Sequence, residues 1–217
     1  MSAEIKVAIA DDHLIFRKGV IMCLRPYSNI KFVLEASNGE ELLKNIEEAN
    51  PNVVLMDLRM PVKDGIEATK YINKHYPKIA VLILTMHDEE KFVTHLMENG
   101  ANGYLLKNAD PLEIKKAILE VATKGYYLNN YVNRILLKRA HNKSKSITIN
   151  ANPDEISEKE REVLRYICME FTSQQIGDKM NISARTVETI KERLMERFGA
   201  KNTAGLVFYA VKNDLVE

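Results

Sequence analysis

The stretch Val53-Val54-Leu55-Met56-Asp57 decides the fold: four apolar residues run directly into a carboxylate. A short apolar run of this kind is typical of a strand buried on both faces of a parallel sheet. Similar runs give the expected strands 5–10, 31–36, 53–56, 79–84 and 103–106. Helix-length segments alternate with them near 13–25, 39–49, 64–75, 89–98 and 110–124. The alternation predicts an α/β domain with a five-stranded parallel, doubly wound sheet.

The 217 residues have an ordinary globular composition, with 46% hydrophobic and 28% charged residues. This excludes a collagen-like, coiled-coil or fully disordered chain. Apolar runs such as Ile79–Leu84 are too short to cross a bilayer, and the first twelve residues lack a secretory signal pattern. Cys23 and Cys168 are too few for a disulfide framework or, alone, for a zinc site. We therefore expect a cytoplasmic protein with no membrane partner.

Three aspartates follow two of the expected strands. Asp11 and Asp12 come directly after the first strand, and Asp57 follows the third. Because the carboxyl ends of parallel strands meet at one edge of a sheet, these carboxylates converge if the two strands are neighbours. Acidic residues often occur in loops without a role, but three at two strand ends favour a functional site. Close carboxylates repel each other, and an oxygen-only ligand set suits Mg²⁺.

Two further polar residues are expected at the same edge. Thr85 ends the fourth strand and Lys107 the fifth, which adds a hydroxyl and an ammonium group. A hydroxyl, a cation and Mg²⁺ around one carboxylate describe a phosphoryl site, because a transferred phosphoryl group needs its charge neutralised. Asp57 would be the nucleophile that forms an aspartyl phosphate.

These residues make 5–124 resemble the receiver domain of two-component response regulators, which has a flavodoxin-like fold. The matching motifs are Asp11-Asp12, Asp57-Leu58-Arg59-Met60-Pro61, Asp64-Gly65, Thr85 and Gly103-Tyr104-Leu105-Leu106-Lys107. The resemblance implies that a sensor histidine kinase phosphorylates Asp57. It also implies that Mg²⁺ is held by Asp12, Asp57 and the backbone carbonyl of Arg59, with Asp11 supporting it through water.

The same resemblance assigns the remaining site residues. It implies that Thr85 and Lys107 grip the phosphoryl oxygens and that the ring of Tyr104 changes rotamer with Thr85. The alternative for Tyr104 is a half-buried strand aromatic without a switching role. We also expect His87 and Arg59 to tune how readily water attacks the phosphoaspartate.

After Pro153 the pattern becomes helical. Ser157–Glu160 and Thr172–Gln175 have the spacing of capping boxes that open two helices. Ser183 can cap a third, longer helix that ends at Gly199, and its inner face is Val187, Ile190, Leu194 and Phe198. A fourth helix runs through Leu206, Val207, Ala210 and Val211. Two short helices, a tight turn and a longer amphipathic helix outline a helix-turn-helix.

Residues 153–217 resemble the small all-α helix-turn-helix domain of LuxR/NarL-type regulators. The resemblance implies dimeric, sequence-specific binding to double-stranded promoter DNA, with helix 184–198 in the major groove. A helical wheel puts the candidate base contacts opposite the apolar face or beside that position: Arg185, Glu188, Thr189, Glu192 and Arg193. The candidate phosphate contacts are Lys179, Lys191 and Lys201, with Gln174 and Gln175.

The net charge of +1 conceals a basic segment between these two parts. Residues 121–152 carry six Lys and Arg and no Asp or Glu, which is typical of a linker. It either acts as a solvated tether or touches DNA phosphates, and a short helix carrying Val132, Ile135 and Leu136 is expected near its start. The expected division is a receiver over 1–124, a linker over 125–152 and a DNA-binding domain over 153–217.

The main hypothesis is a transcription factor in which phosphorylation of Asp57 controls dimerisation and DNA binding, with RNA polymerase as a further candidate partner. The enzyme alternative is a phosphohydrolase that works through an aspartyl phosphate. That chemistry favours a second carboxylate two residues after the nucleophile, where this chain has Arg59. A third alternative is a protein-interaction regulator with a degenerate helix-turn-helix, which the glutamates on the DNA-facing surface support.

Overall fold

The computed structural model describes residues 4–86, 90–129, 131–132, 156–213 and 215–216. The chain divides into two compact units, Met1–Tyr127 and Leu128–Glu217. His87, and the linker helix expected to include Ile135 and Leu136, lie outside the described residues. Within the described part, no helix combines the length and the apolar character that a membrane crossing requires.

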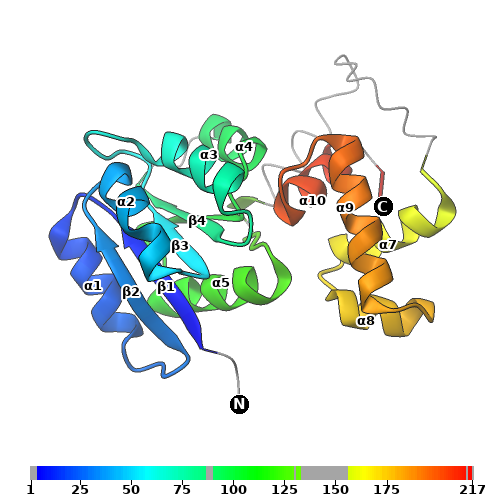
Figure 1. Ribbon diagram of the computed structural model, residues 1–217, viewed down its shortest axis with the longest axis horizontal. Helices are drawn as coiled ribbons and strands as arrows, with labels where there is room; N and C mark the ends of the chain where they lie inside the picture. The colour runs from blue at the N-terminus through cyan, green and yellow to red at the C-terminus, as the bar shows by residue number, and fades with distance from the viewer. Residues whose placement is uncertain (1–3, 87–89, 130, 133–155, 214, 217) are drawn as a thin grey trace. The chain divides into compact units, whose positions relative to one another are not determined.

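The first unit is built on a parallel sheet with the strand order β2-β1-β3-β4-β5. Its strands are β1 (Ile5–Ala10), β2 (Ile30–Ala36), β3 (Val53–Met56), β4 (Ala80–Thr85) and β5 (Gly103–Leu106). Its helices are α1 (Leu14–Leu24), α2 (Gly39–Ala49), α3 (Gly65–His75), α4 (Glu90–Glu98) and α5 (Pro111–Lys124). Figure 1 shows α1 and α5 on one face of the sheet and α2, α3 and α4 on the other. The predicted five-stranded, doubly wound α/β fold is confirmed.

Burial on both faces explains why the strands read as continuous apolar runs. Val7, Ile9 and Leu55 pack against α1 and α5, while the alternate residues of each strand point to the opposite face. All four residues of β3 are buried. The strand limits differ from the expected ones only at the ends, since β2 begins one residue earlier and β4 is shifted by one residue to include Thr85.

Polar residues start α3 and α5 by accepting hydrogen bonds from the first turns of these helices. The side chain of Asp64 accepts from the backbone N–H of Glu67 at the start of α3, and Asp110 does the same for Leu112 at the start of α5. Each cap satisfies a backbone donor that the helix itself cannot. The two caps therefore fix where the loops after β3 and β5 end.

The sheet register brings the acidic residues together. Ala10 of β1 is paired with Met56 of β3, so the next residues, Asp11 and Asp57, leave neighbouring strands at the same level. The backbone N–H of Asp57 donates to the carbonyl of Ala10 at 2.9 Å, which extends the ladder by one step. β1 and β3 also form the point where the strand order reverses, and such a point opens a crevice at the carboxyl edge of the sheet.

The second unit contains α7 (Glu158–Cys168), α8 (Ser173–Met180), α9 (Ala184–Phe198) and α10 (Thr203–Lys212). The predicted capping boxes at Ser157 and Thr172 are both present, and Ser183 caps α9. The apolar face predicted for the third helix, Val187, Ile190, Leu194 and Phe198, is buried. These caps and this face confirm the predicted all-α helix-turn-helix.

The turn between α8 and α9 is tight enough to require a glycine. A β-carbon on Gly177 would lie 2.6 Å from the backbone oxygen of Ile182, closer than such atoms approach in proteins. The backbone N–H of Ile182 donates to the carbonyl of Gly177 at 2.9 Å, and Asn181 has a left-handed φ of 54°. The short turn holds α8 and α9 at a fixed angle.

Candidate functional site

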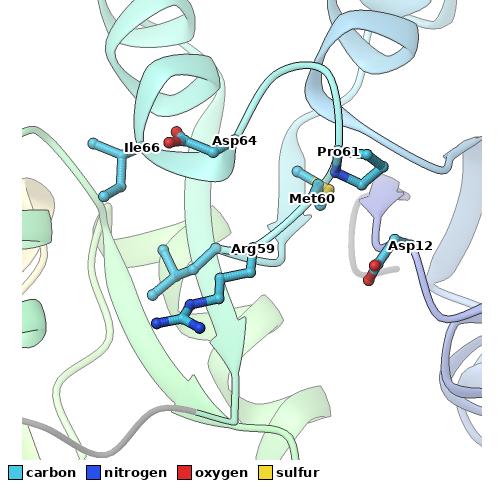
Figure 2. Close-up of a pocket in the computed structure, with 7 residues that line it drawn as sticks. Asp12, Arg59, Met60, Pro61, Asp64 and Ile66 are labelled. Atoms are coloured by element: carbon cyan, nitrogen blue, oxygen red, sulfur yellow. The ribbon is translucent and has the colours of Figure 1, made fainter.

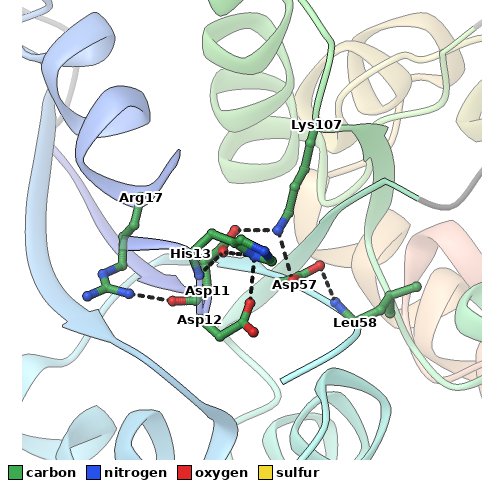
Figure 3. A network of polar contacts seen from close by, with 7 residues as sticks. All are labelled: Asp11, Asp12, His13, Arg17, Asp57, Leu58 and Lys107. Carbon is green, nitrogen blue, oxygen red and sulfur yellow. Dashed lines mark hydrogen bonds and ion pairs between the residues drawn. The ribbon is translucent and has the colours of Figure 1, made fainter. Parts of the chain in front are cut away.

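A buried ammonium group joins two of the predicted aspartates. Lys107 Nζ lies 2.8 Å from Asp11 Oδ2 and 2.9 Å from Asp57 Oδ2. Figure 3 shows Lys107 reaching between the two carboxylates. Asp11 is 2% exposed and Asp57 is 5% exposed, so water screens these charges only weakly. Lys107 therefore compensates part of the negative charge of the two buried aspartates.

The environment of Asp57 keeps one of its oxygens bound to the loop that follows it. Asp57 Oδ1 accepts a hydrogen bond from the backbone N–H of Leu58 at 2.8 Å. Burial raises the pKa of Asp57, although its hydrogen bond and charge interaction with Lys107 act in the opposite direction and Asp11 adds a further increase. Burial would lower the pKa of Lys107, but its bonds to Asp11 and Asp57 raise it above its ordinary value.

Gly65 lets the chain pass directly behind Asp57. Its backbone N–H donates to the carbonyl of Leu58 at 2.9 Å, and an added β-carbon would lie 2.0 Å from the backbone oxygen of Asp57. No side chain can occupy that space. The start of α3 is thereby held against the residue that carries the site.

The donor set at this edge fits a hard divalent cation. Ligand atoms of Asp11, Asp12, His13 and Asp57 all lie within 4.8 Å of one another. Three of the four groups are carboxylates, whose oxygens suit Mg²⁺. The side chain of Asp12 is about a third exposed, which gives the cluster access to solvent. A pocket of about 530 Å³ adjoins Asp12, and Figure 2 shows the residues that line it, Leu58, Arg59, Met60, Pro61, Asp64 and Ile66 among them.

Thr85 and Tyr104 are both fully buried, with exposed fractions of 1% and 0%. Ile83 is paired with Tyr104 across β4 and β5, and Thr85 lies two residues beyond Ile83 on the same face of the sheet. Thr85 and Tyr104 are therefore diagonal neighbours on one face. The burial of Tyr104 is more complete than the half-buried alternative assumed. The backbone N–H of Lys107 donates to the carbonyl of Thr85 at 2.8 Å, which ties the ends of both strands together.

Two residues of this site were absent from the sequence prediction. His13 Nδ1 lies 2.8 Å from Asp12 Oδ1, and the backbone N–H of His13 donates to Asp11 Oδ1 at 2.8 Å. Arg17 donates from its guanidinium to the backbone carbonyl of Asp11 and lies near Glu35 of β2. Arg17 and Lys18 are the two cations of α1, and the sequence does not indicate which of them turns inward. Both contacts orient Asp11 from the start of α1.

The exposed face of α9 carries most of the predicted base contacts. Arg185, Thr189, Glu192 and Arg193 are exposed. The Thr189 hydroxyl donates to the carbonyl of Arg185 at 2.9 Å, so the hydroxyl is occupied within the helix and the methyl group is the remaining part of the side chain. A methyl group can make apolar contact with the methyl group of thymine.

The structure places three other predicted contacts, Glu188, Lys191 and Lys179, against protein groups. Glu188 accepts a hydrogen bond from the Ser173 hydroxyl of α8 and forms an ion pair with Lys191 at 2.5 Å. Lys179 Nζ lies 4.8 Å from the centre of the Phe171 ring, a cation–π distance. Lys201, at the start of the turn before α10, is exposed.

Two family models together match most of the chain. Residues 7–119 match the response regulator receiver domain, and residues 154–210 match the luxR family of bacterial regulatory proteins. These matches cover most of the unit that contains Asp57, the helices α7 to α9 and most of α10.

Individual relatives show the same combination. The oxygen regulatory protein NreC of Staphylococcus aureus (strain bovine RF122 / ET3-1) is 36% identical over 98% of this chain and 99% of its own. A structure of the RcsB response regulator from Salmonella typhimurium, described for its conformational dynamism in DNA interaction, is 29% identical over 96% of this chain and 98% of its own, with a TM-score of 0.57. The receiver domain of a NarL from Mycobacterium tuberculosis is 35% identical over 56% of this chain and 98% of its own, with a TM-score of 0.54.

Proposed function

Because the chain belongs to the NarL/LuxR-type response regulators of two-component systems, which join a receiver domain to a luxR-family DNA-binding domain, we propose that Asp57 is its phosphoacceptor. The observation that carries the proposal is the buried triad of Asp11, Asp57 and Lys107 at the sheet edge. The family consists of transcription regulators, so the phosphohydrolase alternative is set aside. The proposed limits are 1–124 for the receiver, 125–152 for the linker and 153–217 for the DNA-binding domain.

The proposed phosphodonor is a phosphohistidine on a sensor histidine kinase. A carboxylate oxygen of Asp57 attacks the phosphorus atom, a P–O bond forms, the P–N bond to the imidazole breaks, and the imidazole leaves with that electron pair and takes up a proton. Lys107 already contacts Asp57 and neutralises charge on the phosphoryl oxygens, and the Thr85 hydroxyl is the proposed second donor.

We assign the metal ligands of this site to Asp12, Asp57 and the backbone carbonyl of Arg59, with Asp11 acting through water. Mg²⁺ bound there supplies positive charge close to the phosphoryl group. The convergence of the aspartate oxygens supports this assignment. The loop that contains Arg59 also lines the pocket beside Asp12 (Figure 2).

The proposed output is phosphorylation-dependent dimerisation and binding to promoter DNA in the cytoplasm. A phosphoryl group adds negative charge and strong acceptor oxygens at Asp57, which draws the Thr85 hydroxyl toward it and lets the ring of Tyr104 follow. In the second unit, Arg185, Thr189, Glu192 and Arg193 of α9 are the proposed base contacts, and Lys179 and Lys201 contact phosphates. RNA polymerase is the further proposed partner.

A fragment-library binding experiment tests this function. The full-length protein is incubated with sheared genomic DNA, with and without the beryllofluoride adduct at Asp57, and bound fragments are sequenced. We expect a small set of enriched sites whose enrichment rises with the adduct. An Asp57→Asn chain, which cannot form the adduct, is the control. Equal enrichment of all fragments would instead support the protein-interaction alternative.

A further inference from the structure

Both carboxylate oxygens of Glu188 are committed to protein groups. Oε1 accepts a hydrogen bond from the Ser173 hydroxyl at the start of α8. Oε2 forms the ion pair with Lys191 Nζ at 2.5 Å, one helical turn further along α9. A glutamate that reads cytosine must present a carboxylate oxygen to the N4 amino group in the groove. The contact with Ser173 draws the carboxylate of Glu188 toward α8, while 45% of its side chain is exposed.

The pairing also changes the role expected for Lys191. The exposed fraction of its side chain is 18%, and its charge is compensated by Glu188. Counterions condensed on DNA are released when cations of the protein take their place at the phosphates. A lysine that stays paired with a glutamate does not take that place, so its presence releases few counterions. Lys191 therefore contributes less to non-specific affinity than its position in the sequence indicates.

The charge state of Glu188 agrees with this geometry. Burial would raise the pKa of Glu188, but its hydrogen bonds to Lys191 and Ser173 and the lysine charge lower it below the ordinary value. The carboxylate is therefore ionised at neutral pH and keeps both contacts. The tie between Glu188 and Ser173 holds the beginning of α8 against α9, whereas the close approach of Gly177 and Ile182 acts at the turn where α8 ends.

We propose that Glu188 is a positioning residue, which fixes α8 against α9 and holds Lys191 away from the phosphates, and that it reads no base. This proposal rests on the proposed DNA-binding function. It leaves four residues of α9 as the proposed base contacts: Arg185, Thr189, Glu192 and Arg193. The sequence predicted Glu188 as a base contact because a helical wheel shows on which side of α9 the residue lies. The wheel does not show that Ser173 of α8 contacts its carboxylate.

The salt dependence of DNA binding tests the role of Lys191. Full-length wild type, Lys191→Gln, Glu188→Gln and the double variant are titrated by fluorescence anisotropy against a labelled random-sequence duplex over a series of KCl concentrations. We expect Lys191→Gln alone to leave the slope of log K against log [KCl] unchanged. Glu188→Gln frees the lysine and steepens the slope by about one per protomer, and the double variant restores it. If Lys191→Gln alone flattens the slope by about one, the proposal is wrong.

A base-substitution profile tests whether Glu188 reads DNA. The duplex is the tightest one that wild type selects from a random library, with each base pair exchanged in turn. We expect Glu188→Gln to keep the wild-type profile, and Ser173→Ala to weaken binding to every duplex by the same factor. Loss of about tenfold discrimination at one base pair in Glu188→Gln would contradict the proposal.

Two controls keep these outcomes separate. Circular dichroism and thermal melting check that each variant is folded. If Glu188→Gln does not fold, the slope of Lys191→Gln alone decides whether Glu188 holds Lys191 away from the phosphates. If wild type selects no duplex above the random one, sequence-specific binding fails as a function, while the slope comparison on random DNA still decides the role of Glu188.

Discussion

Lys107 Nζ donates a hydrogen bond to Asp57 Oδ2 at 2.9 Å, across a separation of 50 positions in the sequence. The same ammonium group lies 2.8 Å from Asp11 Oδ2. Two buried carboxylates therefore share one ammonium group, and neutralising Asp57 would leave Lys107 paired with Asp11. The carboxylate proposed to accept phosphate is therefore also a group whose charge affects the stability of the receiver unit.

We expect Asp57→Asn to raise the urea midpoint of the protein at neutral pH. Burial raises the pKa of Asp57 in the folded state, so the ionised carboxylate destabilises the fold above that pKa. The gain should shrink as the pH falls from the raised folded-state pKa toward the ordinary value of 3.8, and vanish below it. Urea unfolding followed by circular dichroism at several pH values measures this. A variant that is less stable than wild type at neutral pH would refute the sign of the shift.

Gly65→Ala should destabilise the protein by about 1–3 kcal/mol or more, because its β-carbon would meet the backbone oxygen of Asp57 at 2.0 Å. Displacement of this loop should also slow phosphorylation of Asp57. The matched control is Gly19→Ala within α1, where an added β-carbon meets nothing within 4 Å. That change should stabilise the protein by about 0.8–1 kcal/mol through helix propensity. Denaturant titrations of both variants compare the two, and equal effects would contradict the close approach.

Ser157→Ala should cost about 1 kcal/mol of stability at neutral pH, because it removes the hydroxyl that caps α7 and donates to Glu160. The bonds from the Ser157 backbone and hydroxyl lower the pKa of Glu160. Their stabilisation is therefore complete above the ordinary pKa of 4.5 and is lost as the pH falls through the lower folded-state pKa. Thermal melts of both proteins across that range should show the difference narrowing in acid. A difference that stays constant with pH would exclude the contribution of Glu160.

One of the two thiols should react with Ellman's reagent in the native protein. Cys23 is exposed on α1, whereas burial raises the pKa of Cys168 to about 12. Thiolate is the reactive form, so Cys168 should react only after unfolding. Counting the thiols at pH 8 with and without denaturant checks this, and Cys23→Ser should abolish the native signal. Two rapid equivalents without denaturant would contradict the burial of Cys168.

The sequence predicted the parts of the fold that depend on periodicity and strand ends. Apolar runs that stop at Asp11, Asp57 and Thr85 mark the carboxyl edge, and a parallel sheet leaves few ways to arrange them. The caps at Ser157 and Thr172 were predictable for the same local reason, since a capping box involves residues three positions apart.

Contacts between elements were beyond the reach of the sequence. Arg17 reaches the carbonyl of Asp11 because of the rotation of α1 about its axis, which the weakly amphipathic sequence of that helix does not determine. Glu188 lies at the edge of the exposed face of α9, where the wheel alone favours solvent or DNA, and the position of Ser173 on α8 decides its direction. Side-chain pairing across packed elements depends on tertiary geometry, which a one-dimensional pattern does not contain.

The central claim is that Asp57 is esterified by phosphate with the help of a divalent cation. Intact-protein mass spectrometry after incubation with acetyl phosphate and MgCl₂ tests it most directly, with EDTA-treated protein and Asp57→Asn as parallel samples. We predict the added mass of one phosphoryl group in the wild-type sample with Mg²⁺ and none in the other two. An unmodified wild-type protein, or equal modification of Asp57→Asn, would contradict the account.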